Sequence, residues 1–214
     1  GQVLKAVKDA GLDDNTIVIF TSDNGGANYI GLPEINKPFR GWKASFFEGG
    51  IRVPFFIKWP AKIAKGTTFA GAAGHVDIFS TAAAAAGADL PTDRAMDGVN
   101  LMPFITGAAQ GNPHQTMFWR SGAYKVLLAG GWKLQVSEHQ KKTWLFDLKT
   151  DPTEKTNVAD NEPVKLAEMQ ALLAKEDAAQ AKPLWPSLLE GAIPIDRPLD
   201  TPEVKDEEFI YWAN

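Results

Sequence analysis

Two short polar strings carry the side chains best suited to chemistry in this sequence. The first is Asp-Asn-Gly-Gly at residues 23–26, and the second is Glu-Gly-Gly at residues 48–50, with Lys43 between them. A carboxylate beside a carboxamide offers two hard oxygen ligands, which suit Ca²⁺ or Mg²⁺ rather than Zn²⁺. An ammonium group held near such an ion would bind a tetrahedral oxyanion and stabilise its charge. Asp23, Asn24 and Lys43 are therefore the first candidates for a site.

Each of these signals also has a structural explanation, which stays open. Asn-Gly is among the strongest turn dipeptides, and a single Lys is usually a solvated surface residue. Two ligands are also too few for Ca²⁺, which takes about 6–8 oxygens, so further ligands must come from elsewhere. Glu48 and Arg52 are expected to pair and fix the double-glycine turn. Arg40 and Trp42 are candidates for lining a substrate mouth beside Lys43, with a role as loop anchors as the alternative.

The elements around these strings predict an α/β architecture. Helical spacing of apolar residues predicts a helix over residues 2–10, before a near-continuous apolar strand over residues 16–22 of the type buried in a parallel sheet. A second apolar strand over residues 53–59 and a helix over residues 76–86 follow. Ligands of open α/β sheets gather at the carboxyl ends of strands, where Asp23 lies. Residues 1–111 are therefore predicted to be part of a large mixed sheet with helices.

The pattern changes near residue 112. Short apolar runs predict a four-stranded antiparallel sheet with strands at residues 117–120, 124–129, 132–137 and 143–148. The longest predicted helix, residues 163–181, begins at a proline and has an apolar stripe that is expected to pack on this sheet. Residues 112–182 thus form a second predicted region. Repeated prolines predict that residues 183–214 are an extended tail, with a strand only at residues 209–212.

Composition excludes several classes of function. The chain has 214 residues, a net charge of -4 and no Cys. A mildly acidic protein does not suit a general nucleic-acid or anionic membrane surface. Without Cys, this chain holds no disulfide, thiolate zinc site or cysteine nucleophile. The sequence contains no apolar run of about 18 residues, the length that would predict a membrane span. His75, His114 and His139 lack the spacing of metal ligands and are interpreted as satisfied or exposed side chains.

Taken in order, the motifs resemble the sulfatase family of the alkaline phosphatase superfamily. They are Thr-Ser-Asp-Asn-Gly-Gly at residues 21–26, Lys43, Phe-Glu-Gly-Gly-Ile-Arg-Val-Pro at residues 47–54, and later landmarks at residues 75–79, 96–101, 131–134 and 145–152. The resemblance covers roughly residues 1–165. It identifies the chain as the C-terminal portion of an arylsulfatase-type protein and favours a periplasmic or secreted location.

This resemblance implies a sulfuric ester hydrolase. Asp23 and Asn24 would supply two Ca²⁺ ligands, with Mg²⁺ as an alternative, and Lys43 would contact the sulfate of the substrate. The family's nucleophile is a formylglycine hydrate, made from the first residue of a Cys/Ser-x-Pro-x-Arg string, which attacks sulfur before the alcohol leaves. No such string begins at any serine of this chain. We therefore expect the formylglycine and the further acidic ligands in a missing N-terminal part, and a chain that is inactive alone.

Two alternatives stay open. A related phosphatase or phosphonate hydrolase would share the metal site, and because phosphate and sulfate are both tetrahedral, the residues present discriminate poorly between them. A non-catalytic binding module would use the fold without the chemistry, and metal titration of the chain alone would separate it from the enzymes. Sulfated polysaccharides, aryl sulfates and steroid sulfates all remain open as substrates.

Overall fold

Segments distant in the sequence combine into two units in the computed structural model, which describes residues 1–185 and 187–213. The first unit contains residues 1–20 and 55–115, and the second contains residues 21–54 and the chain from residue 116 onward. Residues 21–54 therefore pack with the later sheet rather than with the strands that flank them in the sequence. The domain boundaries predicted at residues 111 and 182 stay predictions.

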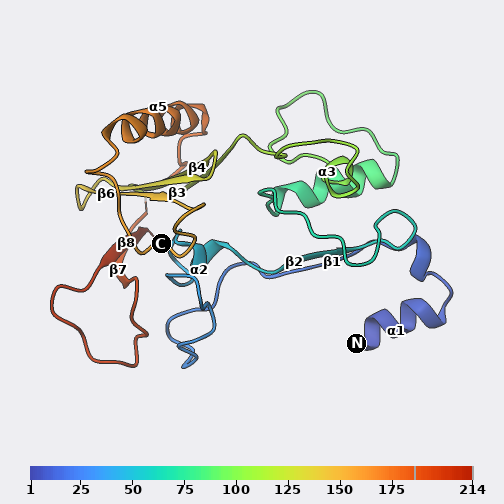
Figure 1. Cartoon of the computed structure of the whole chain (residues 1–214), viewed down its shortest axis with the longest axis horizontal. Coiled ribbons are helices and arrows are strands. Elements are labelled where there is room, and N and C mark those ends of the chain that lie inside the picture. The colour runs from blue at the N-terminus through green and yellow to red at the C-terminus, as the bar shows by residue number, and fades with distance from the viewer. Residues whose placement is uncertain (186, 214) are drawn as a thin grey trace. The chain divides into compact units, whose positions relative to one another are not determined.

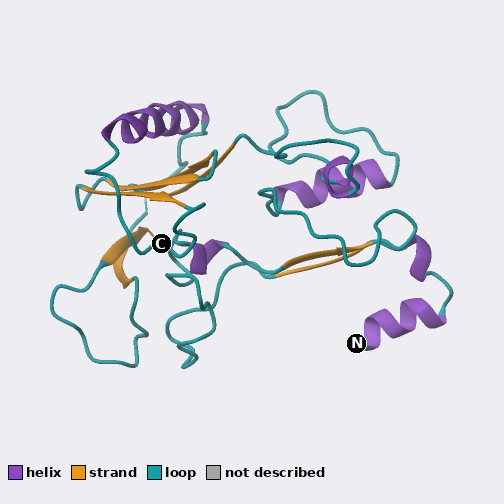
Figure 2. Cartoon of the chain, viewed as in Figure 1, coloured by secondary structure: helices purple, strands orange, loops and turns teal. Residues whose placement is uncertain are grey.

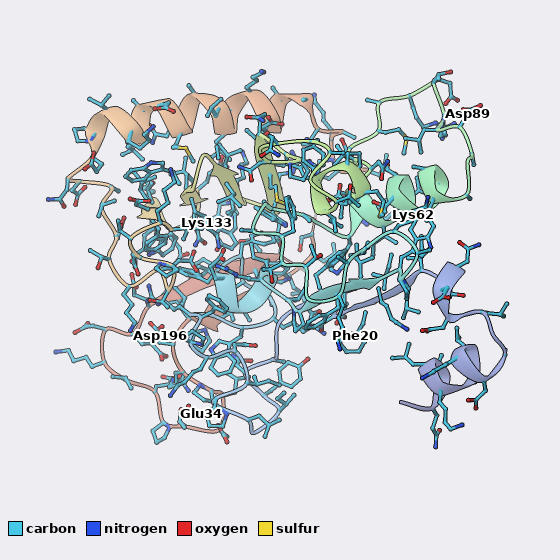
Figure 3. All side chains as sticks on the ribbon, turned by 45° about the vertical axis from the view of Figure 1, so that its right-hand side comes forward. Phe20, Glu34, Lys62, Asp89, Lys133 and Asp196 are labelled. Carbon is cyan, nitrogen blue, oxygen red and sulfur yellow. The ribbon has the colours of Figure 1, made fainter. Side chains whose placement is uncertain are left out.

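The first unit contains most of the elements predicted for the N-terminal region (Figure 2). They are α1 (Gln2–Asp9), the short 3-10 helix η1 (Asp13–Asn15), β1 (Val18–Thr21, whose last residue belongs to the second unit), β2 (Phe55–Lys58), α3 (Val76–Ala85) and α4 (Met102–Ile105). β1 and β2 pair in a two-stranded sheet. Phe20 on β1 and Phe56 on β2 are 66% and 64% exposed, and Phe20 lies on the outside of this unit (Figure 3). The predicted strand is confirmed, but its expected burial is not reached within this chain.

The second unit contains the predicted four-stranded antiparallel sheet. Its strands lie side by side in chain order, β3 (Thr116–Ser121), β4 (Tyr124–Ala129), β5 (Trp132–Ser137) and β6 (Lys142–Asp147). Gly130 and Gly131 join β4 to β5 with φ of 59° and 89°, a backbone conformation that glycine adopts readily. The long helix α5 (Pro163–Ala179) runs along one face of this sheet (Figure 1) and buries Met169 and Leu173.

The two faces of the sheet bury different material, because successive side chains of a strand point to opposite faces. The face under α5, which we call the α5 face, is apolar. Its Leu127, Leu134 and Leu145 pack against Ala159, Met169 and Leu173. The opposite face, which we call the loop face, packs Tyr124, Val126, Trp144 and Phe146 against Phe46, Phe47, Ile195 and Ile210. The fully buried polar side chains of Lys133 and Gln135 alternate with Leu134 along β5 and also lie on the loop face.

The tail is more structured than predicted. β7 (Glu190–Pro194) pairs with β8 (Phe209–Ala213) as an antiparallel hairpin. The strand at residues 190–194 was not predicted. It tolerates its proline because Pro194 lies at its end, where a missing N–H costs little. Pro186 and Asn214 of the predicted tail lie outside the described residues. A single helical turn, α2 (Glu48–Ile51), begins at the predicted double-glycine string.

The observed architecture confirms the predicted α/β class and the small antiparallel sheet with its long helix. Among the helices that the structure describes, none is long and apolar enough to cross a membrane.

Candidate functional site

Close packing of glycine backbones makes the two predicted strings neighbours in space. The N–H of Gly25 donates to the carbonyl of Gly50 at 2.8 Å, and the N–H of Gly49 donates to the carbonyl of Arg40 at 2.7 Å. A Cβ atom added to Gly25 would lie 1.7 Å from the carbonyl oxygen of Gly49, and one added to Gly49 would lie 2.4 Å from that of Gly41. No side chain fits at such distances, so these positions require glycine.

Lys43 is attached to the same cluster through its backbone. Its N–H donates to the carbonyl of Gly26 at 3.0 Å. The side chain of Asn36 reinforces this contact, since its Oδ1 accepts from the N–H of Gly26 at 2.7 Å and its Nδ2 donates to the carbonyls of Gly26 and Gly41. The Lys43 side chain itself is exposed. The loop backbone is thus fixed beside the Asp-Asn-Gly-Gly turn, while the ammonium group is accessible to a ligand.

Asp23 and Asn24 present oxygen atoms that fit part of a Ca²⁺ or Mg²⁺ site. The Asp23 side chain is exposed, and the Nδ2 of Asn24 donates to the carbonyl of Gly25 at 2.8 Å. Because the amide nitrogen is used in this bond, the Oδ1 atom is the group left to act as a ligand. Residues 1–185 and 187–213 contain no group of three or more His, Cys, Asp or Glu that could hold a metal ion. Two oxygens are therefore a partial donor set for Ca²⁺.

Arg40 and Trp42 support the loop from inside. The Nη2 of Arg40 lies 2.6 Å from Asp196 and 2.5 Å from Glu208, and its guanidinium stacks on the ring of Phe47. Burial lowers the pKa of Arg40, but hydrogen bonds to the two carboxylates outweigh it and raise the pKa above its usual value. Trp42 is only 6% exposed. These contacts fit the alternative of loop anchors, and contact of either side chain with substrate stays a prediction.

Glu48 belongs to a buried ionic network that sequence reasoning missed. The Nζ of Lys133 lies 2.9 Å from an oxygen of Glu48 and 2.9 Å from one of Glu154. Burial raises the pKa of the Glu154 carboxyl, and the ammonium group of Lys133 opposes this rise. The predicted pair of Glu48 with Arg52 is confirmed at 3.3 Å. The polar positions of β5 alternate with apolar ones, a pattern typical of a strand with one solvated face, so no local pattern indicates that Lys133 is buried.

Two of the histidines pair with carboxylates. The Nε2 of His114 lies 2.8 Å from the Oδ1 of Asp77 in the first unit, and the Nδ1 of His139 lies 2.7 Å from Glu190 in the second. The interpretation of these two residues as satisfied side chains is confirmed.

Known proteins share both sequence and fold with this chain. The family model described as Sulfatase matches residues 1–88. Steryl-sulfatase of Rattus norvegicus is 39% identical over 158 residues, which are 71% of this chain and 27% of that protein. N-acetylgalactosamine-6-O-sulfatase of Bacteroides thetaiotaomicron is 30% identical over 197 residues, which are 81% of this chain and 38% of that protein. The chain thus spans between about a quarter and two fifths of the length of these relatives.

Solved structures extend the likeness to the fold. The crystal structure of Ps i-CgsB in complex with k-i-k-neocarrahexaose superposes with a TM-score of 0.74 at 28% identity, covering 86% of this chain and 41% of that one. Phosphonate monoester hydrolase SpPMH from Silicibacter pomeroyi gives a TM-score of 0.65 at 20% identity, covering 84% and 38%. The second likeness is one of fold alone.

Proposed function

This chain belongs to the sulfatase family, and from that premise we propose that it contributes the sulfate-binding lysine and two metal ligands to a sulfuric ester hydrolase. The observation that carries the proposal is the glycine packing, which ties the backbones of the Asp-Asn-Gly-Gly turn, the Lys43 loop and α2 into one cluster. Three side chains suited to a metal and an oxyanion therefore start from a single fixed backbone. Such preorganisation is what stabilisation of developing charge requires.

The roles of the individual residues follow from their chemistry. The exposed ammonium group of Lys43 binds a sulfate oxygen and stabilises negative charge as the ester bond breaks. The carboxylate of Asp23 and the Oδ1 of Asn24 would hold Ca²⁺, with Mg²⁺ as an alternative. When bound, that ion supplies Lewis-acid polarisation of the sulfate group. We place the formylglycine nucleophile and the further metal ligands in a preceding part of the same protein, which is the partner that this site needs.

Substitution of Lys43 in the full-length protein tests this proposal. Lys43→Ala is expected to lower kcat on an aryl sulfate by about 10²–10³-fold, the usual cost of losing one donor to a developing oxyanion. Asp23→Ala should raise the Ca²⁺ concentration needed for half-maximal activity. Lys37→Ala is the matched control, because Lys37 is an exposed lysine of the same loop that pairs with Glu34. Unchanged activity of Lys43→Ala would contradict the proposal.

A phosphonate hydrolase is the second candidate, favoured by the fold shared with SpPMH. An ammonium group and a divalent ion would serve a tetrahedral phosphonate as well as a sulfate. The same protein assayed on an aryl sulfate and on a phosphonate monoester separates the two, and a higher kcat/KM on the phosphonate would favour this second function. Metal titration of the chain alone tests the third candidate, a non-catalytic binding module.

A further inference from the structure

One buried residue, Glu154, contacts both ends of the loop that carries Lys43. At the start of the loop, Arg40 donates through Nη1 to the backbone carbonyl of Glu154 at 3.2 Å. At its end, the backbone N–H of Glu48 donates to the Glu154 carboxylate. Glu154 is fully buried and has a φ of 55°, a conformation that favours glycine and that its surroundings must hold in place. Both ends of the loop thus depend on the position of this one residue.

Lys133 fixes Glu154 to the sheet. Its Nζ lies 2.9 Å from one oxygen each of Glu154 and Glu48, and the lysine side chain is fully buried in the interior of the second unit (Figure 3). Two buried carboxylates would repel each other without a cation between them. The ammonium group would in turn be very costly to bury without them. The three charged groups therefore hold one another in a single arrangement, which Lys133 attaches to β5.

Further contacts tie the same network to rigid strands. Gln135, next on the loop face of β5, donates to Glu154 at 3.0 Å and accepts from the hydroxyl of Tyr124 on β4. The backbone N–H of Phe46, inside the loop, donates to the Tyr124 hydroxyl at 3.4 Å. The loop is thus held to the sheet at its start, near its end and at its end.

We propose that Lys133 is a positioning residue, which acts with Glu154 to hold residues 40–48 on the four-stranded sheet and so sets the place of Lys43 relative to Asp23 and Asn24. The inference rests on the proposed function for the meaning of that spacing. Movement of Glu48 would reach the Asp-Asn-Gly-Gly turn directly, because Gly49 bonds to Arg40 and Gly50 bonds to Gly25. The backbones of these glycines touch directly, so a movement of Glu48 cannot occur without moving the turn as well.

A role in stability alone is the competing explanation, and it makes a different prediction. Replacing a whole buried ion pair with apolar residues of similar size is often neutral or stabilising, whereas removing one partner is not. The double substitution Lys133→Met with Glu154→Met therefore keeps the core filled while it removes the directional contacts. Glu48 keeps Arg52 as its partner in that variant.

The test is amide hydrogen exchange in the full-length protein. We expect the exchange rates of the N–H groups of Gly25, Lys43 and Gly49 to rise about tenfold or more relative to amides of the β4–β5 ladder. On an aryl sulfate, kcat should fall by up to about 10²-fold, as expected for a displaced catalytic group. Equal changes in loop and ladder, or no change in the loop, would overturn the positioning role. If the double variant does not fold, Glu154→Gln, which keeps an acceptor for Lys133 but not for the N–H of Glu48, is measured by the same ratio.

A matched control lies on the other face of the same sheet. Lys125 on β4 also lies between two carboxylates, at 2.7 Å from Glu138 and 2.9 Å from Asp177. Lys125→Met with Glu138→Met leaves Asp177 paired with Arg120, just as the test variant leaves Glu48 paired with Arg52. This control should leave both the exchange ratio and kcat unchanged.

The exchange ratio needs no activity, so the two proposals fail separately. If the loop amides exchange selectively faster in a protein that hydrolyses no sulfate ester, the positioning role of Lys133 is supported and the proposed function is contradicted. If the exchange ratio is unchanged while Lys43→Ala strongly lowers kcat, the proposed function is supported and the positioning role is contradicted.

Discussion

The two faces of the four-stranded sheet share their strands but are held together by different forces. The α5 face is closed by apolar side chains of one nearby helix. The loop face is closed by three segments, around residues 46–48, 154 and 195–210, and buries the ion pairs of Lys133 among its aromatic side chains. Hydrophobic burial is not directional, whereas a charge-assisted hydrogen bond fixes both distance and angle. The α5 face thus contributes stability, and the loop face adds a fixed geometry where the candidate site begins.

Removing the cation alone should have the largest effect on this comparison. Lys133→Met is expected to lower the free energy of unfolding by about 3–5 kcal/mol, because it leaves the buried carboxylate of Glu154 without a cation and Glu48 with Arg52 alone. Lys125→Met removes a lysine at the edge of the α5 face, where solvent screens the charges, and should cost only about 0.2–1 kcal/mol. Urea unfolding followed by tryptophan fluorescence measures both. Equal losses would show that the buried ion pairs of Lys133 contribute no more stability than the screened pairs of Lys125.

An apolar truncation on the α5 face gives the converse test. Leu134→Ala should cost about 2–5 kcal/mol of unfolding free energy, since Leu134 is fully buried among Leu127, Leu145 and α5. This substitution should change the stability of the protein but not its catalytic rate. In native conditions kcat on an aryl sulfate should stay near that of the unaltered protein. A large loss of kcat in folded Leu134→Ala would show that the α5 face also sets the geometry of the site.

The glycine contacts can be tested by adding a single methyl group. Gly49→Ala forces a Cβ against the carbonyl oxygens of Arg40 and Gly41 and is expected to cost about 1–3 kcal/mol through overpacking. It should also displace the Lys43 loop and lower kcat. Gly130→Ala is a useful contrast, because no atom lies near its added Cβ although its φ is positive. It should weaken the β4–β5 turn while kcat is unchanged in the folded protein.

Acid should weaken the loop face by a smaller amount than these substitutions. Burial raises the pKa of Glu208, but hydrogen bonds from Lys142, Arg40 and Trp144 outweigh it and lower the pKa to about 2. A carboxyl group with a lowered pKa stabilises the fold above its unfolded-state pKa of 4.5, and this contribution is lost as the pH falls toward 2. Glu208→Gln should therefore reduce the loss of stability between pH 4.5 and 2, measured by urea midpoints across that range. An unchanged acid dependence would show that the Glu208 carboxylate does not stabilise the loop face.

Much of the fold was predictable because its signals are local. The β4–β5 hairpin follows from alternating apolar residues on each side of Gly130 and Gly131, and α5 follows from Pro163 and an apolar stripe. The pair of Glu48 with Arg52 is also local, since one helical turn separates them. The tail hairpin was not predicted, because the number of prolines in a segment does not show where each one lies in a strand. Pro194 lies at the end of β7, where it does not interrupt the pairing.

The sequence by itself determined the local elements, the turns and the order of the strings that carry the candidate site. Only the tertiary structure decided which polar residues are buried and which backbones touch. Lys133 reads as a solvated residue of an amphipathic strand, and its burial depends on Glu48, which lies far away in the chain. The glycines at 25 and 49 read as turn formers, yet each is required because another backbone lies against it. Periodicity reports only what neighbouring residues share, whereas burial and close approach are set by partners that the folded chain brings from elsewhere.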